Sequence, residues 1–327
     1  MKAQLLSVTL LSAFSGVLCA ADPTLLNLVM PDAKVVAGVN VEQAKGTPFG
    51  QWILNQIQTN DAGMQKLVDM TGFDPRRDVR EVLVASSGSA QAKTGLALAK
   101  GNFDVARITA AATMAGKDVA NESYGGVTIL EDAKATHGIA FLDNSTVVAG
   151  DLASVKAAID RRNSPQSMAA ATLVKINQWS NAQDAWGISL VPPATLAPAQ
   201  APGGQQPPQM FAAAQNVQQA YGGIKFGNSV VMSAEAVCDT AQNATTLGDL
   251  VKFLINMAQM QAAQHPQAQS LINSVTVTPS GTSLKISASL PEDVFIQMLE
   301  SGKAHAAPGA AGTVPRGNVR RTPQNRK

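Results

Sequence analysis

Apolar residues that alternate with period two constrain the fold of this sequence more than any other feature. From Lys34 to Val41 the side chains of Val35, Ala37, Val39 and Val41 fall on one face, which is typical of a β-strand with one covered face. Short segments of this kind recur along the chain between turns and amphipathic stretches of helical period. We therefore expect an α+β fold of mainly antiparallel sheets with packed helices.

The expected strands and helices divide into two halves, which we interpret as two related α+β domains over residues 22–162 and 163–302. Residues 138–159 and 275–299 each read as strand, turn, strand, polar cap and helix. Each half also holds a Tyr-Gly-Gly step, at Tyr124 and Tyr221, but the two similarities imply different alignments. A stretch rich in proline, glutamine and glycine, residues 192–209, forms a loop within the second domain.

Local signals predict where several of these elements begin and end. Thr47 is a suitable N-cap because proline follows it, and Gly72 suits the end of a helix. The glycine pairs 125–126 and 222–223 each follow a tyrosine and precede a strand. A phosphate loop leads instead from a strand into a helix, so we interpret both pairs as turns.

Residues 1–20 have the layout of a secretory signal peptide. Lys2 precedes an apolar run from Leu5 to Leu18, and small residues separate this run from Asp22. The run is shorter than the roughly 20 residues of a spanning helix. We expect cleavage and export to the periplasm or the extracellular space, with no spanning helix in the mature chain. The alternatives are an uncleaved N-terminal membrane anchor and a lipidated Cys19, although Leu18 is larger than the residue that lipoprotein signals carry there.

The sequence has no recognisable catalytic or metal-binding pattern. Its three histidines are far apart, and a mature chain without Cys19 keeps only the thiol of Cys238, which excludes an internal disulfide. The serines of residues 86–89 lack the flanking glycines of a nucleophile elbow. Met257 and Met260 are spaced as core residues of an amphipathic helix. We assign no catalytic, cofactor-binding or metal-binding residue, and a protein that is not an enzyme is favoured.

Charge is divided unevenly between the body of the chain and its end. All 23 acidic residues lie between Asp22 and Glu300, whereas one of the 25 basic residues, Lys2, precedes this body and six follow it. The body therefore has a formal charge of −5 and the tail one of +6. Residues 303–327 hold almost no large apolar residue, so we expect a disordered basic tail. Its candidate contacts for a polyanionic surface are Arg316, Arg320, Arg321, Arg326 and Lys327. Nucleic acid is disfavoured because the tail lacks aromatic residues for stacking, and a solvated tail is the competing interpretation.

Three segments of the chain carry a resemblance to a known group of proteins. They are residues 30–35 (MPDAKV), 72–78 (GFDPRRD) and 141–156 (FLDNSTVVAGDLASVK). In these segments the chain resembles a group of exported bacterial envelope proteins of unknown function with repeated strand and helix domains. The resemblance implies an α+β fold and an exported location, and it implies no catalytic residues because the group has no settled activity.

These features predict a non-enzymatic, exported interaction or scaffold protein that contacts an unknown component of the envelope, in part through its tail. The alternative is a periplasmic carrier of an apolar or lipid-like ligand, which would require the sheet faces to form a closed apolar groove. A hydrolase with no recognisable motif is the third hypothesis.

Overall fold

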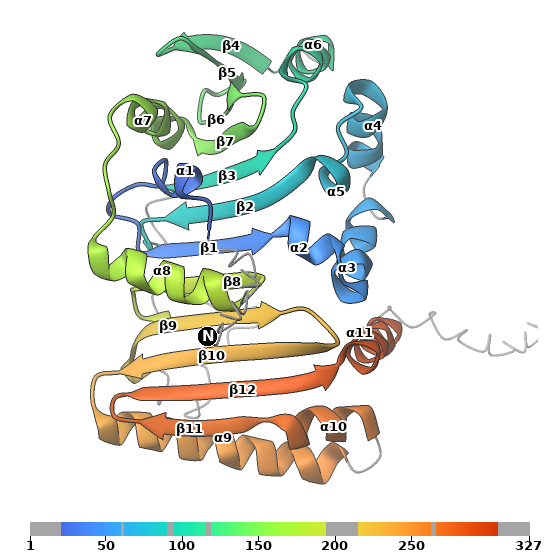
Figure 1. Ribbon diagram of the computed structural model, residues 1–327, viewed down its shortest axis with the longest axis vertical. Coiled ribbons are helices and arrows are strands. Elements are labelled where there is room, and N and C mark those ends of the chain that lie inside the picture. Colours follow the sequence, from blue (N-terminus) through green and yellow to red (C-terminus); the bar gives the residue numbers. More distant parts are fainter. Residues whose placement is uncertain are drawn as a thin grey trace, which may run out of the picture.

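The computed structural model describes residues 21–59, 62–89, 94–115, 119–193, 215–262 and 266–306. The predicted signal peptide, most of the 192–209 loop and the five basic residues predicted as polyanion contacts lie outside these ranges. The described part of the chain is α+β, as the sequence predicts, and it forms one long antiparallel sheet with helices on both faces (Figure 1).

Twelve strands make up this sheet in the described part of the chain. They are β1 (Val35–Asn40), β2 (Val79–Ser86), β3 (Gly95–Gly101), β4 (Val119–Tyr124), β5 (Val127–Asp132), β6 (His137–Asp143), β7 (Thr146–Asp151), β8 (Ala185–Ser189), β9 (Val217–Lys225), β10 (Ser229–Cys238), β11 (Thr276–Ser280) and β12 (Ser283–Pro291). Their order across the sheet is β11-β12-β10-β9-β8-β1-β2-β3-β7-β6-β5-β4. Every neighbouring pair is antiparallel.

Helices connect and cover these strands. They are α1 (Pro23–Leu26), α2 (Val41–Lys45), α3 (Pro48–Thr59), α4 (Ala62–Thr71), α5 (Pro75–Asp78), α6 (Val105–Ala115), α7 (Leu152–Asn163), α8 (Ala170–Ala182), α9 (Ala241–Ala262), α10 (Pro266–Ser274) and α11 (Glu292–Ala306). None of them, within the residues described, is both long enough and apolar enough to cross a membrane.

The two halves of the chain have the same core topology, and they meet at the pairing of β1 with β8. Outward from this seam, the first half runs β1-β2-β3-β7-β6 and the second runs β8-β9-β10-β12-β11. In both halves a helix follows the third strand, and a hairpin and a final helix complete the unit. This repeat matches the similar endings predicted from the sequence. The β4–β5 hairpin is an addition to the first half.

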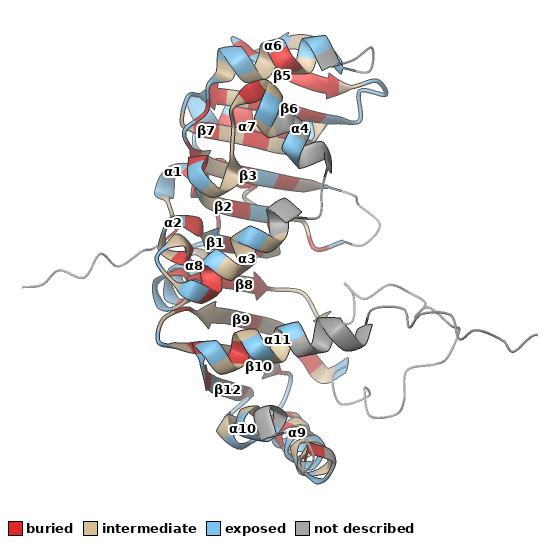
Figure 2. Ribbon diagram, turned by 90° about the vertical axis from the view of Figure 1, so that its right-hand side faces the viewer, coloured by how far each residue is buried: buried red, intermediate tan, exposed pale blue. Residues whose placement is uncertain are grey.

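One face of the central strands is fully covered by α1, α7 and α8 (Figures 1 and 2). The side chains on this covered face come from alternate positions of neighbouring strands and pack into a single aliphatic core. Its most buried members include Val36, Leu83, Leu98, Val148 and Ile188. Burial of such side chains contributes about 1.5–3 kcal/mol each, so this face supplies the main stabilisation of the sheet.

On the other face, α9, α10 and α11 cover the strands of the second half, while α3, α4 and α6 stand beside the first half (Figure 2). A second core forms where α3 meets α11. Phe49 of α3 is its centre and lies 5.0 Å from the ring of Phe295 and 5.3 Å from that of Phe226, edge to face in both cases. Because Phe295 and Phe226 belong to the second half, this cluster holds the two halves together.

Most predicted elements agree with the structure, and the disagreements have local causes. Thr47 accepts a hydrogen bond from the amide of Gly50 and Gly72 has a φ of +69°, as predicted for a helix start and a helix end. Gly125 and Gly126 form a turn with positive φ, but Gly222 and Gly223 lie inside β9. The interpretation of that second pair as a turn was wrong, since β9 begins at Val217 and Ala185 O would lie 2.8 Å from a Cβ at residue 223.

Two further predictions need correction. Val41 begins α2 rather than ending β1, because Asn40 caps that helix by accepting a hydrogen bond from the amide of Gln43. Met260 is 74% exposed and is not a core residue. Helix α9 packs along the edge strand β11, so only one side of this helix is covered.

A buried carboxylate fixes α3 against α11. Glu292, the first residue of α11, accepts a hydrogen bond of 2.5 Å from the backbone amide of Phe49 in the first turn of α3. Amides in the first turn of a helix have no partner within the helix, and a carboxylate there also complements the helix dipole. Further along α11, Glu300 accepts a hydrogen bond from Trp52 of α3, but this pair is exposed.

Glu292→Ala should destabilise the protein by about 1–3 kcal/mol, because it leaves a buried amide of α3 without an acceptor. Glu300→Ala is the matched control, since it removes the exposed contact between the same two helices and should cost less than about 1 kcal/mol. Urea unfolding followed by circular dichroism measures both values. Equal losses for the two variants would contradict the assigned role of Glu292.

Candidate functional site

The face of the central sheet opposite α1, α7 and α8 presents an unbroken row of apolar residues, here called the first row. The strand register aligns one residue from each of eleven consecutive strands: Leu130, Ile139, Ala149, Ala97, Val84, Ala37, Gly187, Gly222, Ala234, Ile286 and Val277. Neighbouring strands are about 4.8 Å apart, so this row is about 48 Å long. Cross-strand partners lie on one face, which makes the row a continuous apolar track.

A second row of apolar residues lies two positions along each strand, on the same face. It consists of Phe141, Val147, Ala99, Val82, Val39, Ala185, Ile224, Met232 and Ala288. Small residues predominate where the two rows cross the middle of the sheet. The surface between the flanking helices is therefore apolar, and its short side chains leave it recessed relative to those helices.

Part of this surface is open to solvent. Val84 is 46% exposed, Ile139 43% and Val39 37%, although all three belong to strands whose opposite face is fully buried. In a strand with one buried face and one solvent-exposed face, the residues on the exposed face are normally polar. A contiguous group of exposed aliphatic residues is a candidate binding surface. We call the exposed part of the two rows, over β1, β2, β3, β7 and β6, the open face.

A hollow of about 380 Å³ deepens the open face beneath α6. Its walls are apolar side chains from α6 and from four neighbouring strands, with charged groups at one rim. The lining residues that carry the argument are Ala112, Val119, Leu130, Ile139 and Ala149. The exposed side chain of Met114 belongs to the same helix α6. A hollow of this size and lining suits one apolar group rather than a large polar substrate.

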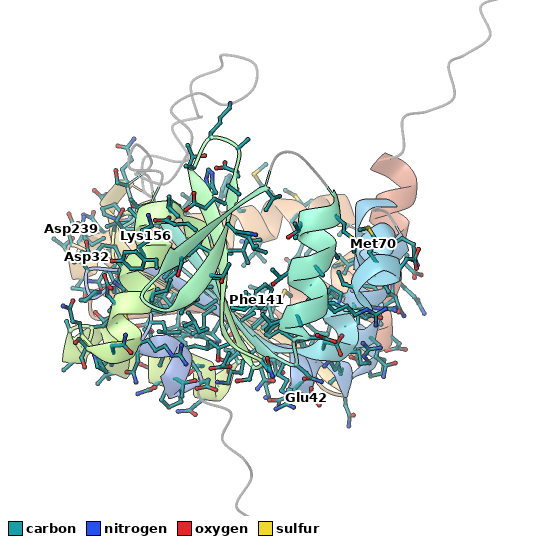
Figure 3. The ribbon with its side chains drawn as sticks, turned by 90° about the horizontal axis from the view of Figure 1, so that it is seen from above. Asp32, Glu42, Met70, Phe141, Lys156 and Asp239 are labelled. Atoms are coloured by element: carbon teal, nitrogen blue, oxygen red, sulfur yellow. The ribbon has the colours of Figure 1, made fainter. Side chains whose placement is uncertain are left out.

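Aromatic residues close the open face where the sheet meets α5 and α6. The Phe103 ring lies 5.8 Å from that of Phe141 and 5.6 Å from that of Phe73. Figure 3 shows Phe141 on the side of the sheet that faces α6, and Lys156 on the other side with α7. Lys156 is one of several ionisable groups near α7, outside the aliphatic core that α7 covers.

Those ionisable groups form a small cluster between β4, β5 and α7. Lys156 of α7 forms an ion pair of 2.7 Å with Glu122 of β4, and Tyr124 donates a hydrogen bond of 3.0 Å to Asp160. A hydrogen bond between the carboxyl groups of Glu122 and Glu131 lowers the pKa of Glu122 and raises that of Glu131. Of the two carboxyl groups, that of Glu131 is therefore the more readily protonated, and Lys156 balances the charge of Glu122.

The charge cluster that the sequence places at residues 74–78 is internally compensated. Arg76 binds Asp74 through contacts of 2.8 and 3.1 Å, and Arg77 binds Asp78 through contacts of 2.7 Å. These bonds lower the pKa values of both aspartates. The adjoining hollow of about 460 Å³ is lined mostly by polar groups, including Arg107. The contacts between these arginines and aspartates make the motif a self-compensating turn.

The sequence contained only part of the signal for the open face. The strand register confirms that Val35, Ala37 and Val39 share a face, as predicted, but the sequence pattern did not indicate that this face is the open one. The covered side chain of this strand is Val36. Both faces of β1 are apolar, so alternation alone cannot identify which of them the helices cover. The described residues contain no group of acidic, histidine and cysteine side chains that could hold a metal.

Comparison with known proteins identifies a shared fold but no family. No family model matches the chain, and no curated protein matches it. Crystal form III of TP0453 superposes with a TM-score of 0.52 at 12% identity, covering 84% of this chain and 97% of that one. The chain is similar in fold to TP0453. Crystal form I of the same protein gives a TM-score of 0.50 at 10% identity, over 84% of this chain and 96% of that one.

Glu131→Gln and Glu122→Gln should shift the pH dependence of stability in opposite directions. Because the pKa of Glu131 is raised above its usual value of 4.5, the wild-type protein loses stability as pH rises above 4.5. Glutamine at residue 131 does not titrate and removes that loss. The lowered pKa of Glu122 means that its carboxylate contributes stability that is fully present above the usual value of 4.5 and is lost as pH falls through the lowered pKa, and Gln removes that contribution.

Urea unfolding at about pH 3, about pH 4.5 and about pH 7 tests this pair of predictions. Relative to wild type, Glu131→Gln should gain stability between about pH 4.5 and about pH 7, whereas Glu122→Gln should lose stability between about pH 3 and about pH 4.5. A change of the same sign in both variants would contradict the opposite pKa shifts of the two carboxyl groups.

Proposed function

We propose that this protein is exported and acts by contact rather than by catalysis, with the open face as the surface that binds an apolar partner in the bacterial envelope. The observation that supports this proposal is the unbroken first row, which remains apolar across eleven strands and is exposed at Val84 and Ile139. Water around such residues is released when a partner covers them, and this release favours association.

The shape of the open face favours an extended partner. The exposed parts of the two rows lie side by side across the five strands of the open face, a track about 19 Å long, and the side chains of Ala97, Ala149 and Ala37 are short. An extended acyl chain or an apolar polypeptide segment could follow such a track, whereas a compact polar molecule would leave most of it exposed. Partner, location and export are all parts of the proposal.

A carrier of an apolar or lipid-like ligand is the second candidate, and the hollow beneath α6 favours it. Its volume of about 380 Å³ falls within the range of small-molecule sites. A carrier would shield its ligand in this hollow and release it elsewhere, whereas a contact protein would stay bound along the whole face. The two candidates therefore differ in whether a free, small apolar molecule binds.

The basic tail would add an electrostatic contact. We propose that Arg316, Arg320, Arg321, Arg326 and Lys327 attract a polyanionic surface, while the acidic body stays away from it. In this arrangement the tail supplies salt-sensitive attraction and the open face supplies salt-insensitive apolar contact. The two contributions can be separated experimentally.

Val84→Lys should weaken binding to isolated bacterial envelope fractions by about tenfold or more, because it places a charge in the middle of the first row. Val174→Lys is the matched control, since Val174 is 64% exposed on α8, which covers the opposite face. Both side chains are exposed, so stability should change by less than about 0.5 kcal/mol in each variant.

Co-sedimentation at high salt measures this loss. Equal binding by the two variants would overturn the assignment of the open face. The fluorescent probe N-phenyl-1-naphthylamine distinguishes the carrier: binding that is lost in Ile139→Lys supports a ligand in the hollow, and no binding by wild type contradicts it.

Removing the tail should abolish the salt-sensitive part of envelope binding. Residues 22–302 are compared with residues 22–327 over a salt series from about 0.05 M to about 0.5 M, a range that shortens the screening length to a few ångströms. The longer chain should bind more tightly only at low salt. Indistinguishable binding at every salt concentration would contradict a role for the tail, without affecting the test of the open face.

A further inference from the structure

The segment that follows the predicted signal peptide is firmly attached to the covered face. Leu25 and Leu26 of α1 are buried in the aliphatic core, and the side chain of Asp22 caps α1 by accepting a hydrogen bond of 2.7 Å from the amide of Thr24. The position of the Asp22 backbone nitrogen is therefore fixed by packing on one side and by the cap on the other.

Glu81 of β2 binds this nitrogen with both carboxylate oxygens. The distances from Asp22 N to Oε1 and Oε2 are 3.0 and 3.2 Å. Glu81 is half-buried, and burial is the largest contribution to its raised pKa. The negative charge of the Asp22 side chain raises the pKa of Glu81 further. The Asp22 amide and Lys100 lower this pKa, and Lys100 faces Glu81 from β3. One neutral amide shared between two carboxylate oxygens is a weak partner for a half-buried charge.

The sequence places a suitable cleavage site at this nitrogen. Cys19 and Ala21 are small residues at the two positions that a signal peptidase reads before the bond that it cuts, and Asp22 would be the first residue after that bond. We propose that the mature chain begins at Asp22 and that its new α-ammonium group forms an ion pair with Glu81. This inference rests on the proposed export of the protein.

Cleavage would change the chemistry of the contact without moving its atoms. Hydrolysis of the Ala21–Asp22 peptide bond adds one water, leaves a carboxylate on Ala21 and converts the amide nitrogen of Asp22 into an amine that is protonated near neutral pH. One neutral N–H donor becomes a cation with three donors, at hydrogen-bond distance from both oxygens of Glu81. Glu81 would then be a receptor for the processed N-terminus.

Ala21 gives the competing start site. It is 3% exposed, so a chain that begins at Ala21 keeps one more buried methyl group. In such a chain the α-ammonium group would belong to the residue before Asp22, and the Asp22 amide would remain hydrogen-bonded to Glu81. The small residue Cys19 favours a cut after Ala21, since a cut after Ala20 would put the larger Leu18 at the same position.

Exporting the full chain in a bacterial host and measuring the intact mass and N-terminal sequence of the product tests the start site. A chain that begins at Asp22 is the expected product. A start at Ala21, or a lipidated start at Cys19, overturns this inference and leaves export intact. A product that retains residues 1–20 also overturns this inference, and its recovery in the cytoplasmic fraction would contradict the proposed export as well.

The second experiment places Glu81→Gln in two purified chains, one that begins at Asp22 and one that begins at Ala21. The substitution should lower the melting temperature by about 2–4 °C in the first chain and clearly less in the second. The ion pair raises the pKa of the α-amino group, so the difference is complete at pH values below about 7.7 at which Glu81 is ionised. It disappears as pH rises through the raised value of the α-amino group and as pH falls far enough to protonate Glu81. Equal losses in both chains at every pH would overturn the ion pair.

Discussion

The pairing of β1 with β8 is the contact on which the rest of the structure depends, because it turns two separate halves into one sheet. Ala37 lies opposite Gly187 and Gly38 lies opposite Trp186 in this seam. A Cβ on residue 38 would lie 2.6 Å from Leu83 and 2.8 Å from Trp186, so only glycine lets the indole ring cover the seam. The aliphatic core can then continue from one half into the other without a gap.

A continuous sheet explains why the two faces can have such different roles. The covered face brings together buried residues from both halves, and this shared core makes the sheet rigid. In the middle of the sheet the opposite face does not contribute to this core, and its side chains there are small or aliphatic. The helices at its margins, joined through Phe49 and Glu292, enclose the open face without filling it.

Much of the fold could be predicted from the sequence because its signals are local. Caps such as Thr47, the turn at Gly125 and Gly126, and the similar endings of the two halves depend on a few neighbouring residues. Helix α1 and strand β4 gave no such signal, since α1 is only four residues long and β4 is an exposed edge strand of mostly polar residues. Short helices and edge strands are held by tertiary contacts that no local pattern records.

The candidate site was the least predictable part, for a related physical reason. Its residues are valine, isoleucine, alanine and glycine, which in sequence are indistinguishable from core residues. What makes them a surface is the register of eleven strands and the placement of helices on the other side, and both depend on contacts between distant segments. The receptor role of Glu81 is hidden in the same way, because Asp22 and Glu81 are 59 residues apart.

The seam also resembles an interface between subunits. Because β1 and β8 occupy equivalent positions in the two halves and run antiparallel, a local two-fold axis passes between Ala37 and Gly187, perpendicular to the sheet. Two separate copies of one half could build the same isologous contact with each other. The sheet of this chain therefore has the strand arrangement of a homodimer whose subunits are covalently joined. Joining them frees each half to change independently: the first half adds the β4–β5 hairpin, and its final helix α7 lies on the opposite face of the sheet from α11 of the second half.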